Sequence, residues 1–450
     1  MPSVGCGDEC HRSCSRALAN PHRIRRTRHD RSPPLQNLRV IVFSSLYPSE
    51  AAPGAGLFIR ERIVRLAGRV PVTVVSPQAW SPFDWLIRLG RPQFRPTGAR
   101  LESRDGLVVH RPRFLSLPGM LKRWDGWLMA RCCLATVRRL ARQQGTTLID
   151  AHFLYPDGWA ATEIGRRLDL PVAITLRGSK DQSLLGTDRE PMLREALHRA
   201  SALIAVSGSL ERDVALPLGA QPGQVNVIGN GVDTGRFRPV DRIRARRELG
   251  LPEDAKVLIG VGNMIPLKGF QRVLPMLPAL RRQFPTLRYL VVGGGATQGD
   301  LTPSLKRQAA DLGVDDIVRF CGRLSPDALR VHYSASDVFA LATEYEGWAN
   351  VLLEAMACGL PVVTTRVGGN PQVVASDALG HLVDWWQPEA FEAALADALQ
   401  RDWDRGAIID YARRNDWESR IDALQLVLED AVARHGRAPA APMSDSSLQP

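Results

Sequence analysis

Short runs of β-branched and other apolar residues alternate along this chain with longer amphipathic stretches. Such alternation predicts parallel strands joined by helices, because a parallel strand needs a crossover and is buried on both faces. In the first half, strands are predicted at residues 38–45, 71–76, 107–111, 148–153, 172–176, 202–207 and 225–229. A second series is predicted at residues 256–262, 289–293, 317–321, 338–342, 361–365 and 381–384. The pattern therefore predicts an α/β protein with two doubly wound sheets.

The two series predict two Rossmann-like domains that face each other across a cleft. Turn-forming residues separate them, with Asn230-Gly231-Val232-Asp233 followed by Phe237, Arg238 and Pro239. A final amphipathic helix opens at Trp417. The predicted order is a disordered extension at residues 1–37, an N-terminal domain at 38–238, a C-terminal domain at 239–416, the last helix at 417–434 and a disordered tail at 435–450.

Composition and charge narrow the class of protein. Of 450 residues, 44% are hydrophobic and 23% are charged, which excludes a wholly disordered, collagenous or fibrous chain. The net charge of +11 suggests phosphates, nucleic acid or an anionic membrane as partner. The segment before Leu38 contains seven Arg and three acidic residues, so it contributes about +4 to the net charge of +11. The body of the chain is only moderately basic.

The cysteines give no clear metal or disulfide framework. Cys6, Cys10 and Cys14, with His11 among them, leave a small zinc site conceivable, but no CxxC pair is present and we expect no metal. The other four cysteines lack disulfide spacing, and the N-terminus lacks the apolar run of a secretory signal. No apolar stretch approaches the length of a transmembrane helix. We therefore expect a cytoplasmic protein.

Two glutamates mark the most informative segment, Glu346-Gly-Trp-Ala-Asn-Val-Leu-Leu-Glu354-Ala-Met-Ala-Cys-Gly359-Leu-Pro361. It follows a strand, opens a helix near Ala349 and ends with helix-stopping residues. Apolar residues flank Glu354 at helical spacing, so its carboxylate should be partly buried and need donors, which the hydroxyls of a ribose would supply. Capping by backbone amides or pairing with a distant Arg explains Glu354 equally well. Glu346 stands at a strand end, where open α/β sheets bind ligands, but an exposed position near a helix start remains an alternative.

Lys268 stands between a strand and a helix predicted to start near Gly269. The dipole of a helix disfavours a cation at its N-terminus, and a bound anion would resolve that conflict. Helix amides plus a lysine make a phosphate site, although a solvated surface lysine is the alternative. No Walker sequence is present, and Gly293-Gly294-Gly295 lacks the spacing of a dinucleotide fingerprint.

The glutamate segment resembles the retaining GT-B glycosyltransferases of family 4. Further segments that resemble the family follow in the expected order: Ser45-Leu-Tyr-Pro48, Gly54-Ala-Gly56, Asp150-Ala-His152, Leu176-Arg-Gly178-Ser179, Val206-Ser207, Asn230-Gly231-Val232-Asp233, Pro266-Leu-Lys268-Gly269 and Val367-Gly368-Gly369. The resemblance covers about residues 38–434. It implies a metal-independent enzyme that uses a nucleoside-diphosphate sugar and needs no cofactor.

The resemblance also implies roles for individual residues. Catalysis would fall to His152, Glu346 and Lys268, with Lys268 neutralising the diphosphate and His152 lying by the reacting centre. Glu354 would hold the ribose, and Arg177 and Ser179 would lie on the acceptor side. The remaining donor-binding positions are Gly54, Gly56, Asn263, Gly269, Arg323, Gly347, Asn350 and Val351. The family usually has Arg where this chain has Asn263, so half of the usual cationic pair is absent.

A basic amphipathic segment follows in residues 114–140, shortly after Trp80, Phe83 and Trp85. It either lies on an anionic bilayer, where it would meet a lipid-linked acceptor, or forms a domain helix with a solvated basic face.

The sequence thus predicts a retaining transferase that acts on a saccharide or lipid-linked saccharide, on the cytoplasmic face of the inner membrane if membrane-bound. Exopolysaccharide or cell-envelope glycan synthesis is the expected pathway, and nucleic acid is not an expected partner. A sugar-nucleotide epimerase or phosphorylase is the first alternative, and a non-catalytic polyanion-binding protein is the second.

Overall fold

The computed structural model describes residues 38–91, 94–96, 98–296 and 299–437. The cysteine-rich prefix, which was predicted to be disordered, lies outside the described residues. The last helix continues to Arg437, three residues into the segment predicted as a disordered tail.

The N-terminal half forms an eight-stranded sheet in the order β10-β9-β8-β7-β1-β2-β5-β4. All neighbours are parallel except β4 and β5, which pair antiparallel at the edge. A separate two-stranded parallel sheet joins β3 and β6. The strands are β1 (Val40–Phe43), β2 (Val72–Val75), β3 (Gln78–Trp80), β4 (Leu101–Arg104), β5 (Leu107–His110), β6 (Arg113–Leu115), β7 (Leu148–His152), β8 (Val172–Leu176), β9 (Ala202–Ala205) and β10 (Val225–Val227).

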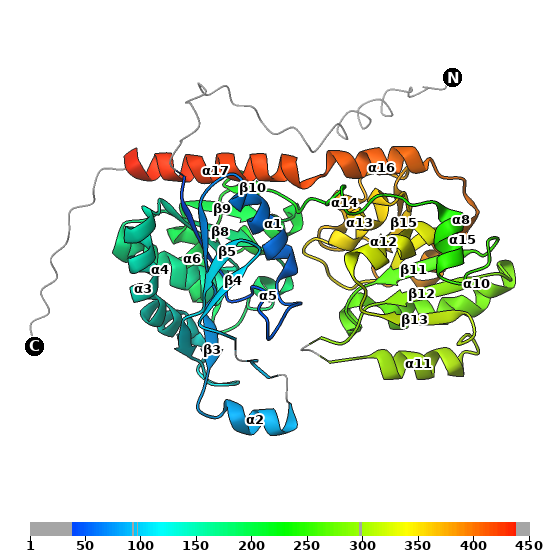
Figure 1. Cartoon of the computed structure of the whole chain (residues 1–450), viewed down its shortest axis with the longest axis horizontal. Coiled ribbons are helices and arrows are strands. Elements are labelled where there is room, and N and C mark those ends of the chain that lie inside the picture. The colour runs from blue at the N-terminus through cyan, green and yellow to red at the C-terminus, as the bar shows by residue number, and fades with distance from the viewer. Residues whose placement is uncertain (1–37, 92–93, 97, 297–298, 438–450) are drawn as a thin grey trace, which may run out of the picture. The chain divides into compact units, whose positions relative to one another are not determined.

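Helices cover both faces of this sheet (Figure 1). Alternate residues of β1 explain why: Ile41 and Phe43 belong to one apolar core, and Val40 and Val42 belong to the other. The helices of this half are α1 (Leu57–Ala67), α2 (Asp84–Gly90), α3 (Asp125–Gln144), α4 (Trp159–Leu168), α5 (Ser179–Gln182), α6 (Glu190–Arg199) and α7 (Gly208–Leu210), with short turns η1 (Lys122–Trp124), η2 (Leu154–Gly158) and η3 (Glu211–Ala215).

The C-terminal half forms a six-stranded, fully parallel sheet in the order β13-β12-β11-β14-β15-β16. Its strands are β11 (Val257–Val261), β12 (Arg288–Val292), β13 (Val318–Gly322), β14 (Val338–Leu341), β15 (Val362–Thr365) and β16 (Gly380–Val383). Its helices are α8 (Arg242–Glu248), α9 (Phe270–Val273), α10 (Leu277–Gln283), α11 (Thr302–Asp311), α12 (Pro326–Ala335), α13 (Asn350–Ala357), α14 (Asn370–Val373), α15 (Pro388–Gln400) and α16 (Arg405–Arg414), with turns η4 (Pro266–Lys268) and η5 (Leu274–Met276).

The last helix, α17 (Trp417–Arg437), packs on the N-terminal half although it follows the C-terminal sheet in sequence (Figure 1). Its apolar side chains Trp417, Ile421, Leu424 and Leu428 are buried in the same core as α1. The linker between the halves runs beside the start of this helix, because the backbone N–H of Val232 donates to the carbonyl of Asn415 at 3.1 Å. The two segments that connect the halves, the linker at Val232 and the chain just before α17, are thus hydrogen-bonded to each other.

All thirteen predicted strands are present, and the prediction of two Rossmann-like α/β domains is confirmed. The pattern missed β3, β4 and β6, which are three or four residues long and carry exposed or charged positions. Of the segment 114–140, residues from Asp125 onward form the domain helix α3, whose apolar stripe points inward. Residues 113–115 form β6 instead of continuing that helix.

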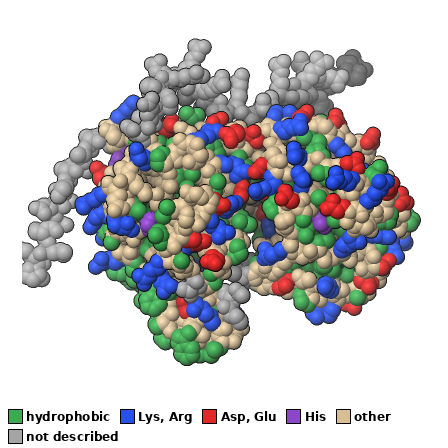
Figure 2. All heavy atoms as spheres, in the orientation of Figure 1, with side chains coloured by type: hydrophobic (Ala, Val, Ile, Leu, Met, Phe, Trp, Pro, Cys, Tyr) green, Lys and Arg blue, Asp and Glu red, His purple; other side chains and the backbone are tan. Residues whose placement is uncertain are grey.

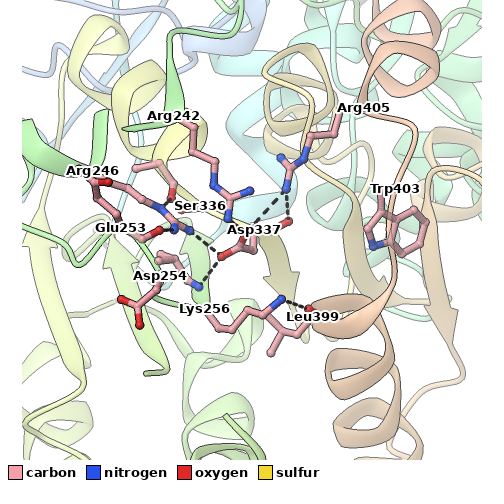
Figure 3. Close-up of polar contacts among 12 residues, drawn as sticks. Arg242, Arg246, Glu253, Asp254, Lys256, Ser336, Asp337, Leu399, Trp403 and Arg405 are labelled. Carbon is pink, nitrogen blue, oxygen red and sulfur yellow. Dashed lines mark hydrogen bonds and ion pairs between the residues drawn. The ribbon is translucent and has the colours of Figure 1, made fainter. Parts of the chain in front are cut away.

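One buried carboxylate clamps the N-terminal ends of the C-terminal strands (Figure 3). Asp337, just before β14, forms ion pairs with Arg242 and Arg246 of α8, the latter at 2.8 Å. It accepts the backbone N–H of Val257 at 2.8 Å and lies 3.8 Å from an Arg405 guanidinium nitrogen. The clamp therefore joins α8, β11, β14 and α16 at the sheet end opposite the predicted site.

Candidate active site

Lys268 and Glu346 meet at the carboxyl ends of adjacent strands. Lys268 ends η4 after β11, and Glu346 lies in the loop after β14. The Lys268 Nζ forms an ion pair with Glu346 Oε1, and Thr343 Oγ1 donates to the same oxygen at 3.2 Å. The Glu346 side chain is 9% exposed and that of Lys268 is 21% exposed. The two residues predicted separately from the sequence thus belong to one charged site.

Backbone contacts hold these two loops together. The carbonyl of Leu267 accepts the backbone N–H of Glu344 at 2.9 Å. It also lies 2.9 Å from the Thr343 hydroxyl, whose single proton it shares with Glu346 Oε1. Gly269 follows with a φ of +80°, and a Cβ at this position would lie 1.8 Å from the Ala342 carbonyl oxygen. Only glycine permits this approach, so Gly269 fixes the position of Lys268 against the end of β14.

The helix predicted to start near Gly269 begins at Phe270, but it is short. The structure has the four-residue α9, the turn η5 and then α10. Pro275 and Pro278 cannot donate backbone hydrogen bonds, which explains why no continuous helix forms. Because α9 has only four residues, its dipole contributes little at Lys268. The attraction for an anion here therefore comes mainly from the lysine charge.

Glu354 is positioned by α13, whose bounds match the helix predicted after Glu346. Its Oε2 accepts a hydrogen bond from the buried Tyr333 hydroxyl at 3.3 Å. Burial raises the pKa of Glu354 to about 7. Among the described residues, the structure gives Glu354 neither a backbone amide cap nor an arginine partner, and the hydrogen-bond donor to its carboxylate is Tyr333. The carboxylate retains capacity for further donors.

Glycines at the ends of β11, β12 and β13 shape the neighbouring surface. Gly293 has a φ of +142°, and a Cβ there would lie 1.7 Å from the Gly262 carbonyl oxygen. The Arg323 side chain lies over Gly294 and donates to the carbonyl of Gly295. The triple glycine therefore forms the loop directly after β12. Asn263, which replaces the usual Arg, is exposed in the same region.

The two glycines predicted to bind the donor, Gly54 and Gly56 before α1, differ in whether the backbone there requires glycine. Gly56 has a φ of +66°, and a Cβ there would lie 2.3 Å from the Leu46 carbonyl oxygen, so this position requires glycine. Gly54 is exposed with open space around it. The structure therefore gives a steric reason for Gly56 and none for Gly54.

His152 lies in a buried polar cluster at the end of β7. Its side chain is fully buried, and its Nδ1 lies 3.3 and 3.1 Å from the Nε and Nη2 of Arg177. Its Nε2 is 3.8 Å from the buried Asp150 carboxylate. Burial and the neighbouring Arg177 and Arg62 charges hold the pKa of His152 well below its usual range. The imidazole is therefore neutral.

Arg177 connects this cluster to the linker. It donates to the Asn230 Oδ1 at 3.1 Å, and Arg62 of α1 donates to the same oxygen at 3.4 Å. The Asn230 amide in turn donates to the Asn350 Oδ1 at 3.0 Å. Asn350 opens the helix that carries Glu354. A continuous hydrogen-bonded path thus joins the end of β7 to α13.

Close backbone packing also brings the two strand-end surfaces together. A Cβ on Gly347 would lie 2.3 Å from the Arg177 carbonyl oxygen and 2.8 Å from the Gly178 Cα. Ser179 begins α5 directly after this contact, and Val351 lies on α13 with partial exposure. The predicted acceptor-side and donor-side segments are therefore neighbours at Gly347.

Sequence reasoning missed several members of this site. Arg62 and Asn230 join the buried cluster, Tyr333 is the donor to Glu354, and Thr343 is a donor to Glu346. Asn230 was noticed as a turn residue and as part of a segment that resembles the family, and no spacing pattern links it to residues more than a hundred positions away. The backbone beside His152 is strained, because Phe153 has a φ of +72°. Such strained residues are often found at functional sites.

Within the described residues, no group of three or more His, Cys, Asp or Glu side chains is arranged to hold a metal ion. Nor does any helix of this part of the chain have the length and hydropathy needed to cross a bilayer. Two surface cavities, of about 580 and 350 Å³, lie at α6 and beside β12 and β13. None of the predicted site residues lines either cavity.

The fold matches solved two-domain transferase structures. Anabaena Alr3699/HepE in complex with UDP aligns with a TM-score of 0.67 and 18% identity, covering 87% of this chain and 100% of its own. Sucrose-phosphate synthase from Thermosynechococcus elongatus aligns with a TM-score of 0.62 and 21% identity, covering 88% and 97%. Together with the strand-end site, this fold defines the GT-B class.

Sequence comparison identifies the family. The model described as Glycosyltransferase Family 4 matches residues 54–236, and the one described as Glycosyl transferases group 1 matches residues 241–415. A D-inositol 3-phosphate glycosyltransferase from Segniliparus rotundus is 31% identical over 415 residues, covering 86% of this chain and 88% of its own. One from Corynebacterium jeikeium is 30% identical over 399 residues, covering 84% and 92%. The chain belongs to glycosyltransferase family 4 and is a glycosyltransferase.

Proposed function

We propose that this glycosyltransferase moves a sugar, with retention of anomeric configuration and without a metal ion, from a nucleoside-diphosphate sugar to a hydroxyl acceptor. The observation that carries the proposal is the ion pair between Lys268 and Glu346 at the ends of β11 and β14. A diphosphate would compete for Lys268, and the released Glu346 carboxylate would then accept hydrogen bonds from sugar hydroxyls.

Each charged group has a defined task in this reaction. Lys268 stabilises the negative charge that develops on the departing diphosphate, where a metal ion acts in other transferases. Glu346 orients the sugar ring, and Glu354 accepts from the ribose hydroxyls. The leaving phosphate takes the acceptor proton on the face from which it departs, which preserves the configuration. His152 is buried, so its contact with the sugar requires Arg177 and the surrounding segments to move.

The acceptor proposed from the sequence is a saccharide or lipid-linked saccharide in exopolysaccharide or cell-envelope glycan synthesis, reached from the cytoplasmic side. The names of the relatives favour a second candidate, an inositol phosphate acceptor. A panel of both acceptor types with the same donor distinguishes them by product formation.

The test begins with donor identification by thermal shift, with UDP-sugars first because a neighbour structure holds UDP. We then expect Lys268→Ala to lower turnover roughly 10²- to 10³-fold while the protein stays folded. Lys306→Ala, on exposed α11, is the matched control and should keep wild-type turnover. Wild-type turnover by Lys268→Ala contradicts the proposal.

Two further measurements test the retention of configuration and the independence from a metal ion. The anomeric configuration of the product, read by NMR coupling constants, must equal that of the donor. Turnover must survive a chelator such as EDTA. Donor consumption without any acceptor would instead indicate an epimerase.

A further inference from the structure

Large apolar side chains are exposed mainly in one part of this protein. Of those that are exposed in the described chain, more than half lie within residues 80–127. Leu89 is 75% exposed, Trp85 is 65% exposed and Met120 is 64% exposed. The aromatic surface, as we call it, comprises Trp80, Phe83, Trp85, Leu86, Leu89, Leu115, Met120, Leu121, Trp124 and Trp127.

Polar contacts hold the segments of this surface side by side. β3 pairs with β6, and the Arg95 side chain bonds both to Asp84 of α2 and to Ser116 after β6. The Lys122 ammonium donates to Ser116 at 2.8 Å and to Asp125 at 3.1 Å. The polar side chains therefore satisfy one another inside, while the apolar side chains point outward. Figure 2 shows hydrophobic side chains gathered where α2 projects.

The net charge of this region is strongly positive. Residues 80–147 contain thirteen Lys and Arg but only four Asp and Glu. Asp84 and Asp125 are buried and bonded, so they do not offset the exposed arginines. Arg123 and Arg131 flank the exposed Trp124 and Trp127 and are themselves exposed. Aromatic and basic side chains thus alternate on the same surface.

We propose that the aromatic surface docks the protein onto an anionic lipid bilayer. Trp and Phe side chains insert at the level of the headgroups, and arginines are attracted by anionic lipid. A second copy of the chain fits less well, because a two-fold dimer through this surface would place its like charges opposite each other. The apolar stripe of α3 is buried, so the docking elements are α2, the β3–β6 sheet and the first turn of α3.

Vesicle sedimentation tests this inference and does not depend on the proposed reaction. The full-length protein is mixed with phosphatidylcholine vesicles that contain or lack phosphatidylglycerol, at low and high salt. We expect binding to the anionic vesicles, weakened by salt, and little binding to the neutral ones. The variant Phe83→Ser/Trp85→Ser/Leu89→Ser should lose binding at least roughly tenfold.

A charge variant and two controls complete the experiment. Arg123→Gln/Arg131→Gln should weaken binding roughly fivefold for each charge removed. Leu426→Ser, at an exposed position of α17, and Arg307→Gln, at an exposed position of α11, should bind like wild type. Unchanged thermal unfolding and donor binding establish that the variants are folded.

Two outcomes overturn the proposal. The first is equal binding of wild type and the triple variant to anionic vesicles. The second is self-association in the absence of vesicles that the triple variant abolishes, which would make the aromatic surface a subunit interface. Vesicle binding with no detectable transferase activity would support this inference while contradicting the proposed function.

Discussion

Glu354 shows how a single residue links burial to function. It sits among apolar neighbours on α13 with one hydrogen bond from Tyr333, and burial raises its pKa to about 7. A raised pKa means that the folded protein holds the proton more tightly than the unfolded chain. The contribution of this group to stability is therefore complete below its unfolded pKa and is lost as the pH rises through about 7.

Donor binding should show the opposite trend with pH. Ribose hydroxyls donate to the ionised carboxylate, so we expect the donor Kd to fall about tenfold between pH 6 and pH 8, as Glu354 ionises. Isothermal titration with the identified nucleotide sugar measures this slope.

The variant Glu354→Gln is the control for that slope. It should bind the donor more weakly, with a Kd that no longer changes between those pH values. Asp150 and Asp181 also have pKa values raised to about 6 by burial, and they remain in the variant. A slope that persists in Glu354→Gln would assign the pH dependence to one of those groups.

At the scale of elements, Asp337 holds the C-terminal half together (Figure 3). The Asp337→Ala variant leaves the buried Arg246 without its carboxylate partner, and we expect a loss of about 3–5 kcal/mol in the free energy of unfolding. Chemical denaturation measures this loss.

Asp316→Ala provides the comparison for Asp337→Ala. Asp316 pairs with Arg281 on the surface, where both side chains are at least 40% exposed, so the expected loss is below about 1 kcal/mol. Equal losses of unfolding free energy in the two variants would show that the buried ion pairs of Asp337 stabilise the fold no more than a surface pair does. Donor affinity should survive in both, because the clamp lies at the opposite strand ends.

Elements also differ in how well the sequence predicted them. The buried parallel strands were found because their apolar runs are continuous on both faces, as in β1 and β11. The edge strands β3, β4 and β6 were missed because their short exposed sequences carry no such run. The split of α9 from α10 was missed as well, although Pro275 and Pro278 stood in the sequence.

At the scale of the whole molecule, Asn230 joins the two halves. Its amide bonds to Asn350 while its oxygen accepts from Arg177 and Arg62. We expect Asn230→Ala to lower kcat more than it raises the donor KM, because α13 loses its connection to the His152 cluster. The buried arginines also lose an acceptor, at a cost of about 1–3 kcal/mol in stability.

Steady-state kinetics and thermal unfolding together check this prediction. Asn226→Ala is the control, since the Asn226 side chain donates to the Leu203 carbonyl within the N-terminal half. It should leave the ratio of kcat to KM unchanged. If Asn230→Ala lowers stability without changing kcat, the path through Asn230 is purely structural.

The sequence by itself determined the α/β architecture, the two series of strands, the strand-end positions of Lys268 and Glu346 and the helical position of Glu354. These features follow from local periodicity and from turn residues near each position. Only the tertiary structure decided that Lys268 pairs with Glu346, that His152 is buried under Arg177 and that Asn230 reaches Asn350. Such contacts join residues that are 25 to 120 positions apart, and they arise from strand order and chain crossings that no local pattern encodes.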